Sequence, residues 1–253
     1  MPKRLRQSGR AALLLACAAI LTATDAAGQA ADDAYTEDRL VLVRDIEQHV
    51  YLTSKYLGRS ELSARTVGAL ERVPRHEFVP ESLRRYAYDD RPLPIGHGQT
   101  ISQPYIVAIM TDLLDLEPEC TVLDIGTGSG YQAAMLAELC DSVYSIEIVE
   151  PLGRAARQRL ARLGYDNVTV RIGDGFHGWA EHAPFDGIVV AAVADELPAP
   201  LLAQLKPGGR IIMPVERPGG DQELVLGERR PDGTLARTRM LPVRFVPLTR
   251  DPD

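Results

Sequence analysis

Residues 122–134 of the 253-residue chain read VLDIGTGSGYQAA. An apolar run ends at Asp124, glycines follow at every second position, and a helix-like segment begins near Tyr131. Glycine permits backbone conformations and close approaches that a Cβ atom would block. A helix that starts directly after such a turn presents unpaired N–H groups to whatever the turn holds. The stretch is therefore predicted to be a ligand-binding turn between a strand and a helix.

The spacing of Gly126, Gly128 and Gly130 bears on which ligand is held. Dinucleotide enzymes place a pyrophosphate on a G-x-G-x-x-G turn, whereas the third glycine here comes one residue earlier. A carboxylate at Asp124 would be unfavourable beside a diphosphate and favourable beside an ammonium group. The turn therefore favours S-adenosylmethionine, whose amino-acid end replaces the pyrophosphate. A nicotinamide (NAD)-dependent oxidoreductase on the same fold is the alternative.

Acidic residues after the next two strands fit an adenosine-containing ligand. Glu147 ends the second predicted strand, where it can bind ribose hydroxyls, as acids also do in NAD enzymes. Asp174, between Gly173 and Gly175, is placed to accept a hydrogen bond from an adenine amino group, although Asp and Gly are also ordinary turn residues. The order of these features supports adenosine binding without choosing the cofactor.

From residue 121 onward, strands and helices alternate, which is typical of a doubly wound, mostly parallel α/β sheet of the Rossmann-like kind. Strands are predicted at 121–125, 143–148, 168–172, 186–192 and 209–215, and helices at 104–116, 130–139 and 150–163. Two last strands, 222–228 and 238–248, have no helix between them and contain Pro242 and Pro247, so we expect an antiparallel C-terminal edge.

Upstream of the sheet, the pattern predicts an N-terminal helical extension. Apolar positions recur near helical period over 38–57, and Ser60 is a plausible N-cap for a helix through 71. A loop rich in proline and glycine is expected at 90–103. The predicted organisation is a leader at 1–30, the extension with its loop at 31–103, and a ligand-binding domain at 104–253.

The first thirty residues resemble a secretory signal, because a basic head is followed by the apolar run 11–23 and by small residues up to Ala30. We expect cleavage near Ala30 and an exported, periplasmic protein. Two alternatives stay open: a lipoprotein signal with a lipid anchor at Cys17, or an upstream start codon that adds a tail to a cytoplasmic protein. The apolar run is too short to span a bilayer.

Residues 31–253 hold 24 basic and 34 acidic side chains, a formal net charge of −10. Nucleic-acid binding requires a basic surface that displaces counterions, so we expect no nucleic-acid partner. A surface of this sign also has no attraction to anionic lipid, so no membrane partner is expected once the leader is removed. The mature chain is expected to be a monomer.

The mature chain keeps two cysteines, Cys120 and Cys140, each just before a predicted strand. In an oxidising compartment they could form a disulfide, because neighbouring parallel strands begin close together. Alternatively they are buried, reduced thiols that pack as small hydrophobes, and we favour this second interpretation because it needs no special geometry. No His or Cys pair with ligand spacing lies nearby, so no metal site is expected.

Six distinctive motifs are RVPRHEFVP at 72–80, PIGHGQTISQP at 94–104, DIGTGSGYQAA at 124–134, GDGFHGW at 173–179, EHAPFD at 181–186 and VRFVPL at 243–248. Through these motifs the sequence resembles the protein-L-isoaspartate (D-aspartate) O-methyltransferase family, over approximately residues 40–249. The resemblance implies a class I S-adenosylmethionine-dependent methyltransferase. Such an enzyme esterifies the free carboxylate of L-isoaspartyl, and by extension D-aspartyl, residues in damaged proteins and so starts repair through a succinimide.

The resemblance also implies a set of site residues. Ser102 matches the active-site serine, and substrate binding is assigned to the surrounding loop residues His97, Thr100, Ile101 and Gln103. The cofactor pocket is assigned to Asp124, Gly126, Thr127, Gly128, Gly130, Glu147, Asp174 and Gly175. Three positions depart from the family pattern: Asp124 replaces a glutamate, Ile148 an arginine and Ala191 a threonine.

The chemistry implied by the resemblance needs few catalytic groups. A carboxylate with an ordinary pKa near ~4 is already ionised at neutral pH, so its methylation needs no general base. Alignment and exclusion of water are enough, and Ser102 is expected to orient the acceptor. Its alternative role is to cap the helix that begins at Pro104. His97, between two glycines, equally suits an exposed turn. An exported module that kept the fold but lost turnover is a further alternative.

Overall fold

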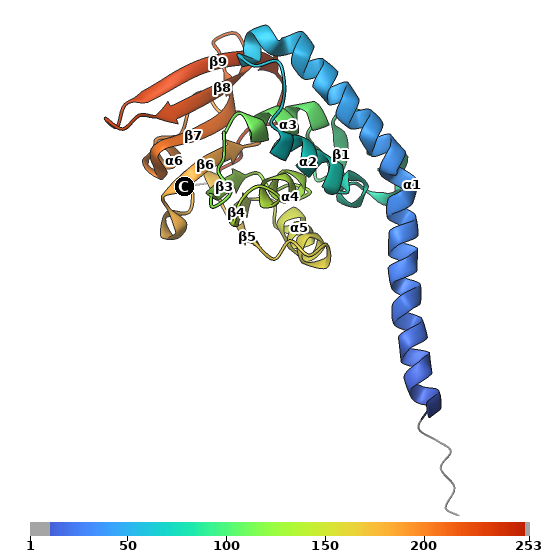
Figure 1. Ribbon diagram of the computed structural model, residues 1–253. Helices are drawn as coiled ribbons and strands as arrows, with labels where there is room; N and C mark the ends of the chain where they lie inside the picture. Colours follow the sequence, from blue (N-terminus) through green and yellow to red (C-terminus); the bar gives the residue numbers. More distant parts are fainter. Residues whose placement is uncertain (1–10, 251–253) are drawn as a thin grey trace, which may run out of the picture.

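The computed structural model describes the backbone of residues 11–250 and the side-chain environment of residues 34–250. A seven-stranded sheet forms its centre, with strand order β5-β4-β3-β6-β7-β8-β9 (Figure 1). The strands are β3 (Thr121–Ile125), β4 (Ser142–Glu147), β5 (Val168–Ile172), β6 (Phe185–Val190), β7 (Leu205–Glu216), β8 (Gln222–Arg229) and β9 (Leu235–Val243). Neighbours from β5 to β7 pair in parallel, and β8 and β9 join as antiparallel strands. The predicted doubly wound sheet with its antiparallel C-terminal edge is confirmed.

Alternate residues of the central strands face two separate hydrophobic cores. Leu123 and Ile125 of β3 pack in one core with α6 (Ala199–Ala203), while Val122 packs in the other with the remaining helices. Side chains of a strand point to opposite faces in turn, so a strand covered on both sides becomes apolar throughout. The helices of the second core are α1 (Ala11–Leu57), α2 (Ala64–Arg72), α3 (Pro104–Asp112), α4 (Tyr131–Ala137) and α5 (Glu150–Arg162).

The N-terminal extension is present, but it differs from the prediction in detail. Ser63 rather than Ser60 caps α2, since the Ser63 side chain accepts a hydrogen bond from the Thr66 N–H. The loop predicted at 90–103 contains a two-stranded hairpin, β1 (Leu93–Gly96) and β2 (Gln99–Ile101). Short 3₁₀ helices, η1 (Arg75–Phe78) and η2 (Glu81–Tyr86), connect α2 to this hairpin.

The expectation of two reduced thiols is wrong, because Cys120 and Cys140 form a disulfide. The Cα atoms lie 4.8 Å apart, within the range that a disulfide spans. This proximity follows from the register of the sheet, in which Thr121 pairs with Ser142 at the start of two parallel strands. The geometry that a bridge requires is thus supplied by strand pairing.

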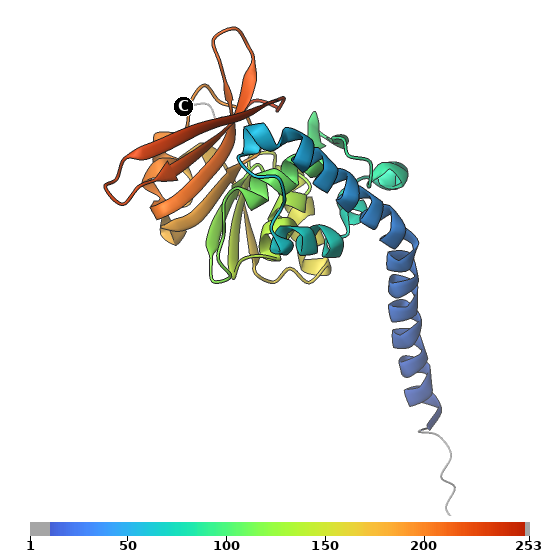
Figure 2. The ribbon, with the colours of Figure 1, turned by 45° about the horizontal axis from the view of Figure 1, so that its top comes forward.

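The predicted leader is only partly described. The basic head at residues 1–10 lies outside the described residues. The predicted boundary near residue 30 falls inside α1, whose first part projects from the body in both views (Figures 1 and 2). Within residues 11–250, no helix has an apolar run long enough to cross a bilayer. The export signal, its cleavage site and the lipid-anchor alternative at Cys17 stay predictions.

Candidate functional site

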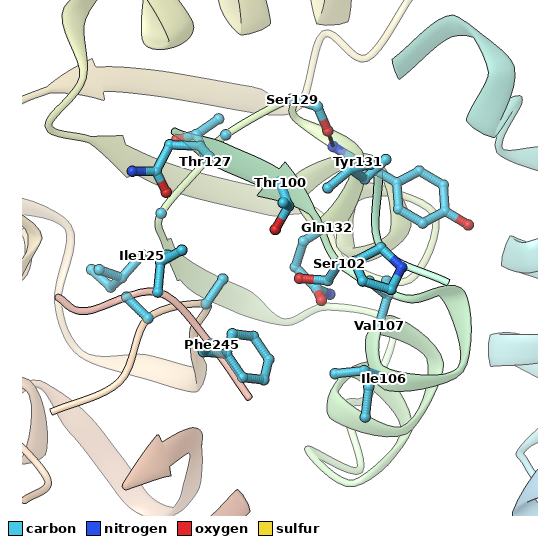
Figure 3. A pocket seen from close by; sticks show the side chains of 18 of the residues that line it. Thr100, Ser102, Ile106, Val107, Ile125, Thr127, Ser129, Tyr131, Gln132 and Phe245 are labelled. Atoms are coloured by element: carbon cyan, nitrogen blue, oxygen red, sulfur yellow. Dashed lines mark hydrogen bonds between the residues drawn. The ribbon is translucent and has the colours of Figure 1, made fainter. Parts of the chain in front are cut away.

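A cavity of about 920 Å³ opens at the carboxyl ends of β3, β4 and β6, where ligands bind in open α/β sheets (Figure 3). Its wall has three parts that are far apart in the sequence. They are the glycine turn with the ends of β4 and β6, the hairpin strand β2 with the start of α3, and the segment 241–249, which comprises the end of β9 and the chain after it.

The glycine turn forms one side of the cavity together with Glu147. Gly126 and Gly128 have φ angles of 91° and 52°, which residues other than glycine rarely adopt. The Glu147 carboxylate accepts hydrogen bonds from the N–H groups of Gly128 (2.7 Å) and Val149 (2.9 Å). A carboxylate has about four acceptor positions, so this fixed side chain keeps capacity for ligand hydroxyls.

Asp124 lies behind this wall and does not line the cavity. The residue is fully buried, and its Oδ2 atom accepts a hydrogen bond of 2.7 Å from the Ser145 hydroxyl. Ser145 is in turn 2.5 Å from the hydroxyl of Thr127, which does line the cavity. The Oδ1 atom of Asp124 has no hydrogen-bond partner among the described residues. Burial raises the pKa of Asp124 to about 7, against a smaller lowering by Ser145.

A ligand with an ammonium group could supply the hydrogen bond that the Asp124 Oδ1 atom lacks. An unpaired buried acceptor costs free energy until a donor or a bridging water reaches it. A positive group near the glycine turn would also favour the ionised form of Asp124. The described residues therefore fit the amino-acid end of S-adenosylmethionine.

The other predicted cofactor residues divide into lining and supporting positions. Gly175 lines the cavity, and a Cβ atom there would stand 2.4 Å from a methyl carbon of Ile125. Asp174 does not line it: one oxygen caps the 3₁₀ turn at Phe176, and the other accepts a 2.8 Å bond from Arg250. Gly130 is also outside the wall, in a position where a Cβ would approach an α5 leucine to 3.2 Å.

The predicted substrate loop forms the facing side of the cavity. Thr100, Ile101, Ser102 and Gln103 all line it, and Figure 3 shows Thr100 and Ser102 at the same wall. His97 does not; it is exposed at the hairpin turn, with a φ of 53°. Gln103, and not Ser102, is the N-cap residue of α3, and the Gln103 side chain makes no capping hydrogen bond. The capping interpretation of Ser102 is therefore wrong.

Sequence reasoning missed Arg75, which supports the Ser102 loop from inside. The side chain is fully buried and donates hydrogen bonds to the carbonyl oxygens of Ala87 (2.9 Å), Arg91 (3.3 Å) and Ser102 (2.9 Å). Its guanidinium also lies 4.8 Å from the ring centre of Tyr131, at the start of α4. Burial lowers the pKa of Arg75 to about 10, which leaves it protonated at neutral pH. Its only signal in the sequence is a charge between Pro74 and His76 in the motif at 72–80.

Asp90 and His49 were also missed, although both act at this wall. The Asp90 carboxylate accepts hydrogen bonds from the Gln103 amide (2.9 Å) and from the Tyr105 N–H (2.8 Å), so it caps α3 from a distance. Its Oδ2 atom is also 3.3 Å from His49 Nδ1. His49 comes from α1, lines the cavity, and stacks on Tyr105 with ring centres 3.8 Å apart. Nothing near these residues in the sequence indicates the contact.

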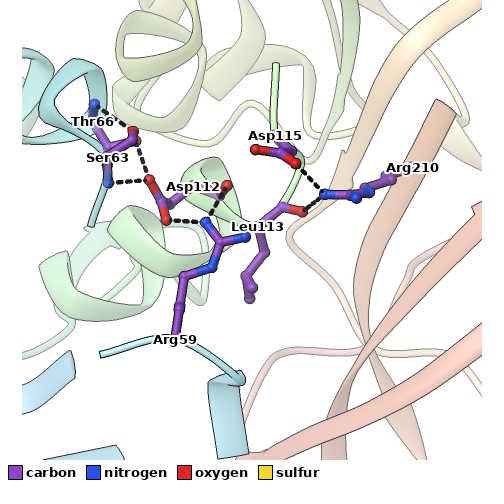
Figure 4. Close-up of polar contacts among 7 residues, drawn as sticks. All are labelled: Arg59, Ser63, Thr66, Asp112, Leu113, Asp115 and Arg210. Atoms are coloured by element: carbon purple, nitrogen blue, oxygen red, sulfur yellow. Dashed lines mark hydrogen bonds and ion pairs between the residues drawn. The ribbon is translucent and has the colours of Figure 1, made fainter. Parts of the chain in front are cut away.

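A second buried carboxylate joins the extension to α3 (Figure 4). Asp112 accepts hydrogen bonds from Arg59 Nη1 (2.5 Å), from the Ser63 N–H (2.8 Å) and from the Thr66 hydroxyl (2.9 Å). Near this point, Arg210 of β7 binds the carbonyl of the residue that follows Asp112. Because these bonds cross between α2, α3 and the sheet, the extension is a fixed part of the site.

The third part of the wall is the segment after β9. Phe245 points into the cavity from the side opposite Ser102 (Figure 3). Main-chain hydrogen bonds from Val193 to Val246 (2.9 Å) and from Leu248 to Val193 (2.8 Å) fix the segment across the end of β6. Two of the departures from the family pattern, Ile148 and Ala191, also line the cavity.

The model of the family described as protein-L-isoaspartate(D-aspartate) O-methyltransferase matches residues 52–252. The chain belongs to this family. A protein-L-isoaspartate O-methyltransferase 2 of Syntrophobacter fumaroxidans is 60% identical over 220 residues, which cover 87% of this chain and 89% of that protein. A protein-L-isoaspartate O-methyltransferase 1 of Cupriavidus necator is 52% identical and covers 94% of this chain and 92% of its own length.

Two solved structures of family members are similar in fold. One protein-L-isoaspartate O-methyltransferase superposes with a TM-score of 0.68 at 31% identity, over 79% of this chain and 65% of that chain. A Plasmodium falciparum protein with the same family description, crystallised with S-adenosyl-L-homocysteine, gives 0.67 at 26% identity, over 81% of this chain and 99% of its own. The fold and the S-adenosylmethionine dependence inferred from the sequence are confirmed. The roles assigned to single residues stay predictions.

Proposed function

We propose that this protein transfers the methyl group of S-adenosylmethionine to the free carboxylate of L-isoaspartyl residues in damaged polypeptides, with D-aspartyl residues as a second acceptor. The observation that carries the proposal is that the glycine turn and the Ser102 loop open onto one cavity. Two reactants held in one cavity react as if at very high concentration. The family supports the same reaction, and it gives no support to a NAD-dependent oxidoreductase.

The cofactor would be held on the glycine-turn side. Glu147 would accept hydrogen bonds from the ribose hydroxyls, the turn at Gly126 and Gly128 would lie beside the amino-acid end, and Asp124 would balance the ammonium charge through Thr127 or a water. Asp174 shapes the adenine end indirectly, because its oxygens cap the turn at Phe176 and bind Arg250. When bound, the cofactor's sulfonium provides an activated methyl group.

On the facing side, the chain's own residues orient the acceptor. The acceptor carboxylate is ionised at neutral pH, so no proton has to be removed from it. Ser102 donates a hydrogen bond that fixes one carboxylate oxygen and leaves the other free to attack. Arg75 positions Ser102 by binding its carbonyl oxygen. Phe245 and Ile101 exclude water from the reacting atoms.

The reaction is tested with an isoaspartyl peptide, the matched aspartyl peptide and cofactor labelled in its methyl group. Transfer to the isoaspartyl peptide at least tenfold above the aspartyl control is expected. Equal transfer to both peptides contradicts the proposal. Binding titrations with S-adenosylmethionine and NAD form the second arm, in which tighter binding of NAD would favour the oxidoreductase.

We also infer that the protein works after export, in the periplasm. Two features support this proposal: the basic and apolar order of residues 1–30, and the bridge between Cys120 and Cys140, since disulfides persist in oxidising compartments. N-terminal sequencing of the fractionated native protein should place it outside the cytoplasm with a new N-terminus near residue 31. An intact N-terminus in the cytoplasmic fraction, with two free thiols, contradicts it. Export without cofactor binding would favour a non-catalytic module.

A further inference from the structure

The large hydrophobic side chains that stay exposed in the described chain all lie on α1. They are Leu40 (41% exposed), Val41 (40%), Tyr51 (66%), Leu52 (67%) and Tyr56 (43%). Single exposed apolar residues need no explanation, whereas a group of them beside a cavity marks an interaction surface. The last three of these residues lie close in sequence to another residue of α1, which already lines the cavity.

That residue is His49, which reaches the cavity wall from the same helix. Leu52 and Tyr56 follow it at three and seven residues, so the three side chains share one flank of α1. The buried face of the helix, with Ile46 and Val50, lies beside this flank. Tyr51, two residues from His49, projects on the other side of α1.

We propose that His49, Leu52 and Tyr56 form a docking surface for the polypeptide that carries the damaged residue. This surface is called the α1 ledge. The inference rests on the proposed function, because it adds to that reaction the chain segment next to the acceptor. The occupant is an extended peptide with apolar side chains, which leaves the cavity over α1.

The occupant follows from continuity with the cavity. An isoaspartyl residue inside a protein is bonded to chain on both sides, so the segments flanking it must leave the cavity across its rim. His49 is the point where α1 forms that rim, and α1 also contacts α3 and β9, whose neighbouring residues form the walls on either side. Leu52 and Tyr56 lie directly beyond that point on the same flank of α1.

The chemistry of His49 suits a peptide main chain. The Asp90 carboxylate only accepts hydrogen bonds, so the Nδ1 atom facing it carries the hydrogen. In the neutral ring, Nε2 is then an acceptor, and no described residue is bonded to it. Asp90 and the stacked Tyr105 fix the orientation of the ring. Nε2 can therefore accept an N–H from the peptide beside the acceptor, while Leu52 and Tyr56 cover apolar side chains farther along it.

The test uses two isoaspartyl peptides: one with a single residue on each side of the acceptor, and one with five residues, including leucines, on each side. The double variant Leu52→Ser/Tyr56→Ser is compared with Leu40→Ser/Tyr51→Ser, which removes the same residue types from the other flank. We expect the first to raise KM for the long peptide about tenfold. KM for the short peptide, kcat and the Kd of S-adenosylmethionine should stay within twofold, and the control should leave all four values within twofold.

His49 is tested separately with both peptides. His49→Leu should raise KM for each about fivefold, because one hydrogen bond to the main chain is lost. His49→Gln should restore part of this loss, since its amide oxygen accepts an N–H.

Several results would overturn the α1 ledge. One is a KM for the long peptide that is unchanged in Leu52→Ser/Tyr56→Ser, or raised equally in the control. Another is a shift of that variant from dimer to monomer on gel filtration with kinetics unchanged, which would assign the face to a second copy of the chain. If the wild-type protein methylates neither isoaspartyl peptide above its aspartyl control, the proposed function fails and the ledge with it. If the wild-type protein methylates the isoaspartyl peptides but KM for the long peptide is unchanged in Leu52→Ser/Tyr56→Ser, only the α1 ledge is contradicted.

Discussion

The two sides of the cavity are built in different ways. The glycine-turn side comes from the ends of short parallel strands, and its polar contacts join residues such as Asp124, Ser145 and Glu147 that lie within about one βαβ unit. The acceptor side is assembled from α1, η1, the β1–β2 hairpin and the segment after β9. Its contacts, such as the one from His49 to Asp90, join residues 41 positions apart.

Because they are built differently, the two sides should control different properties of the enzyme. The glycine-turn side follows from the fold itself, so changes in it should alter cofactor affinity. The acceptor side depends on long-range buried contacts that hold a loop, so changes in that loop should alter turnover and changes at the His49 rim should alter KM for the peptide. The sides meet, among other places, where Arg75 lies against Tyr131 and at Gly128, where a Cβ would stand 3.4 Å from Ile95 of the hairpin.

The largest effect is expected from Glu147→Ala. The variant removes an acceptor for the ribose hydroxyls and leaves the N–H groups of Gly128 and Val149 unpaired. We expect the Kd of S-adenosylmethionine to rise about 100-fold, or about 2.7 kcal/mol, with KM for an isoaspartyl peptide within twofold. Calorimetric titration measures the first value and initial rates at saturating cofactor the second.

Glu150→Ala is the matched control, since Glu150 is an exposed acid nearby that forms a surface ion pair with Arg154. It should leave the cofactor Kd within twofold. If Glu147→Ala changes the peptide KM as strongly as the cofactor Kd, the two sides are not separable and the comparison fails.

The next effect concerns Ser102 on the other side. Ser102→Ala should lower kcat about 30-fold, because an orienting hydrogen bond to the acceptor is lost, while the cofactor Kd stays constant. Ser102→Thr should retain more activity than alanine, and the exposed Ser60→Ala should have no effect. A kcat that survives the loss of the hydroxyl would show that Ser102 only shapes the loop.

Asp124 allows a test by pH on the cofactor side. Burial raises its pKa to about 7, so below that pH the residue is neutral and must lose its proton to pair with an ammonium group. Apparent affinity for S-adenosylmethionine should therefore rise about tenfold for each pH unit up to about 7 and then level off. Asp124→Asn should flatten this slope between pH 5.5 and 8, and an unchanged slope in that variant assigns the pH dependence to another group.

The contrast between local and long-range contacts also explains which features could be predicted from the sequence. The glycine turn, Glu147 and the mostly parallel sheet with its antiparallel edge were predictable because their signals are local: glycine spacing, strand ends and alternating elements. Arg75, Asp90 and His49 were missed because a buried contact over tens of residues leaves no periodic trace. The disulfide shows the same limit, since the register of β3 and β4 decides it and the sequence alone does not fix register. Resemblance, rather than pattern, identified the Ser102 loop.

The smallest effect, and the sharpest test of the acceptor side, is Arg75→Lys. An ammonium group keeps the charge but cannot reproduce the planar fork that serves three carbonyl oxygens. We expect kcat to fall about fivefold with an unchanged cofactor Kd. Arg72→Lys, which alters one exposed pair with Glu138, should change nothing.

Combining the variants decides how Arg75 acts. If it acts by positioning Ser102, then adding Arg75→Lys to Ser102→Ala should cost almost nothing more in kcat, because the group being positioned is already absent. A further fivefold loss in the double variant would mean that Arg75 supports the acceptor side independently of Ser102. Loss of cofactor affinity in Arg75→Lys would instead place its main effect at Tyr131 and join the two sides through that contact.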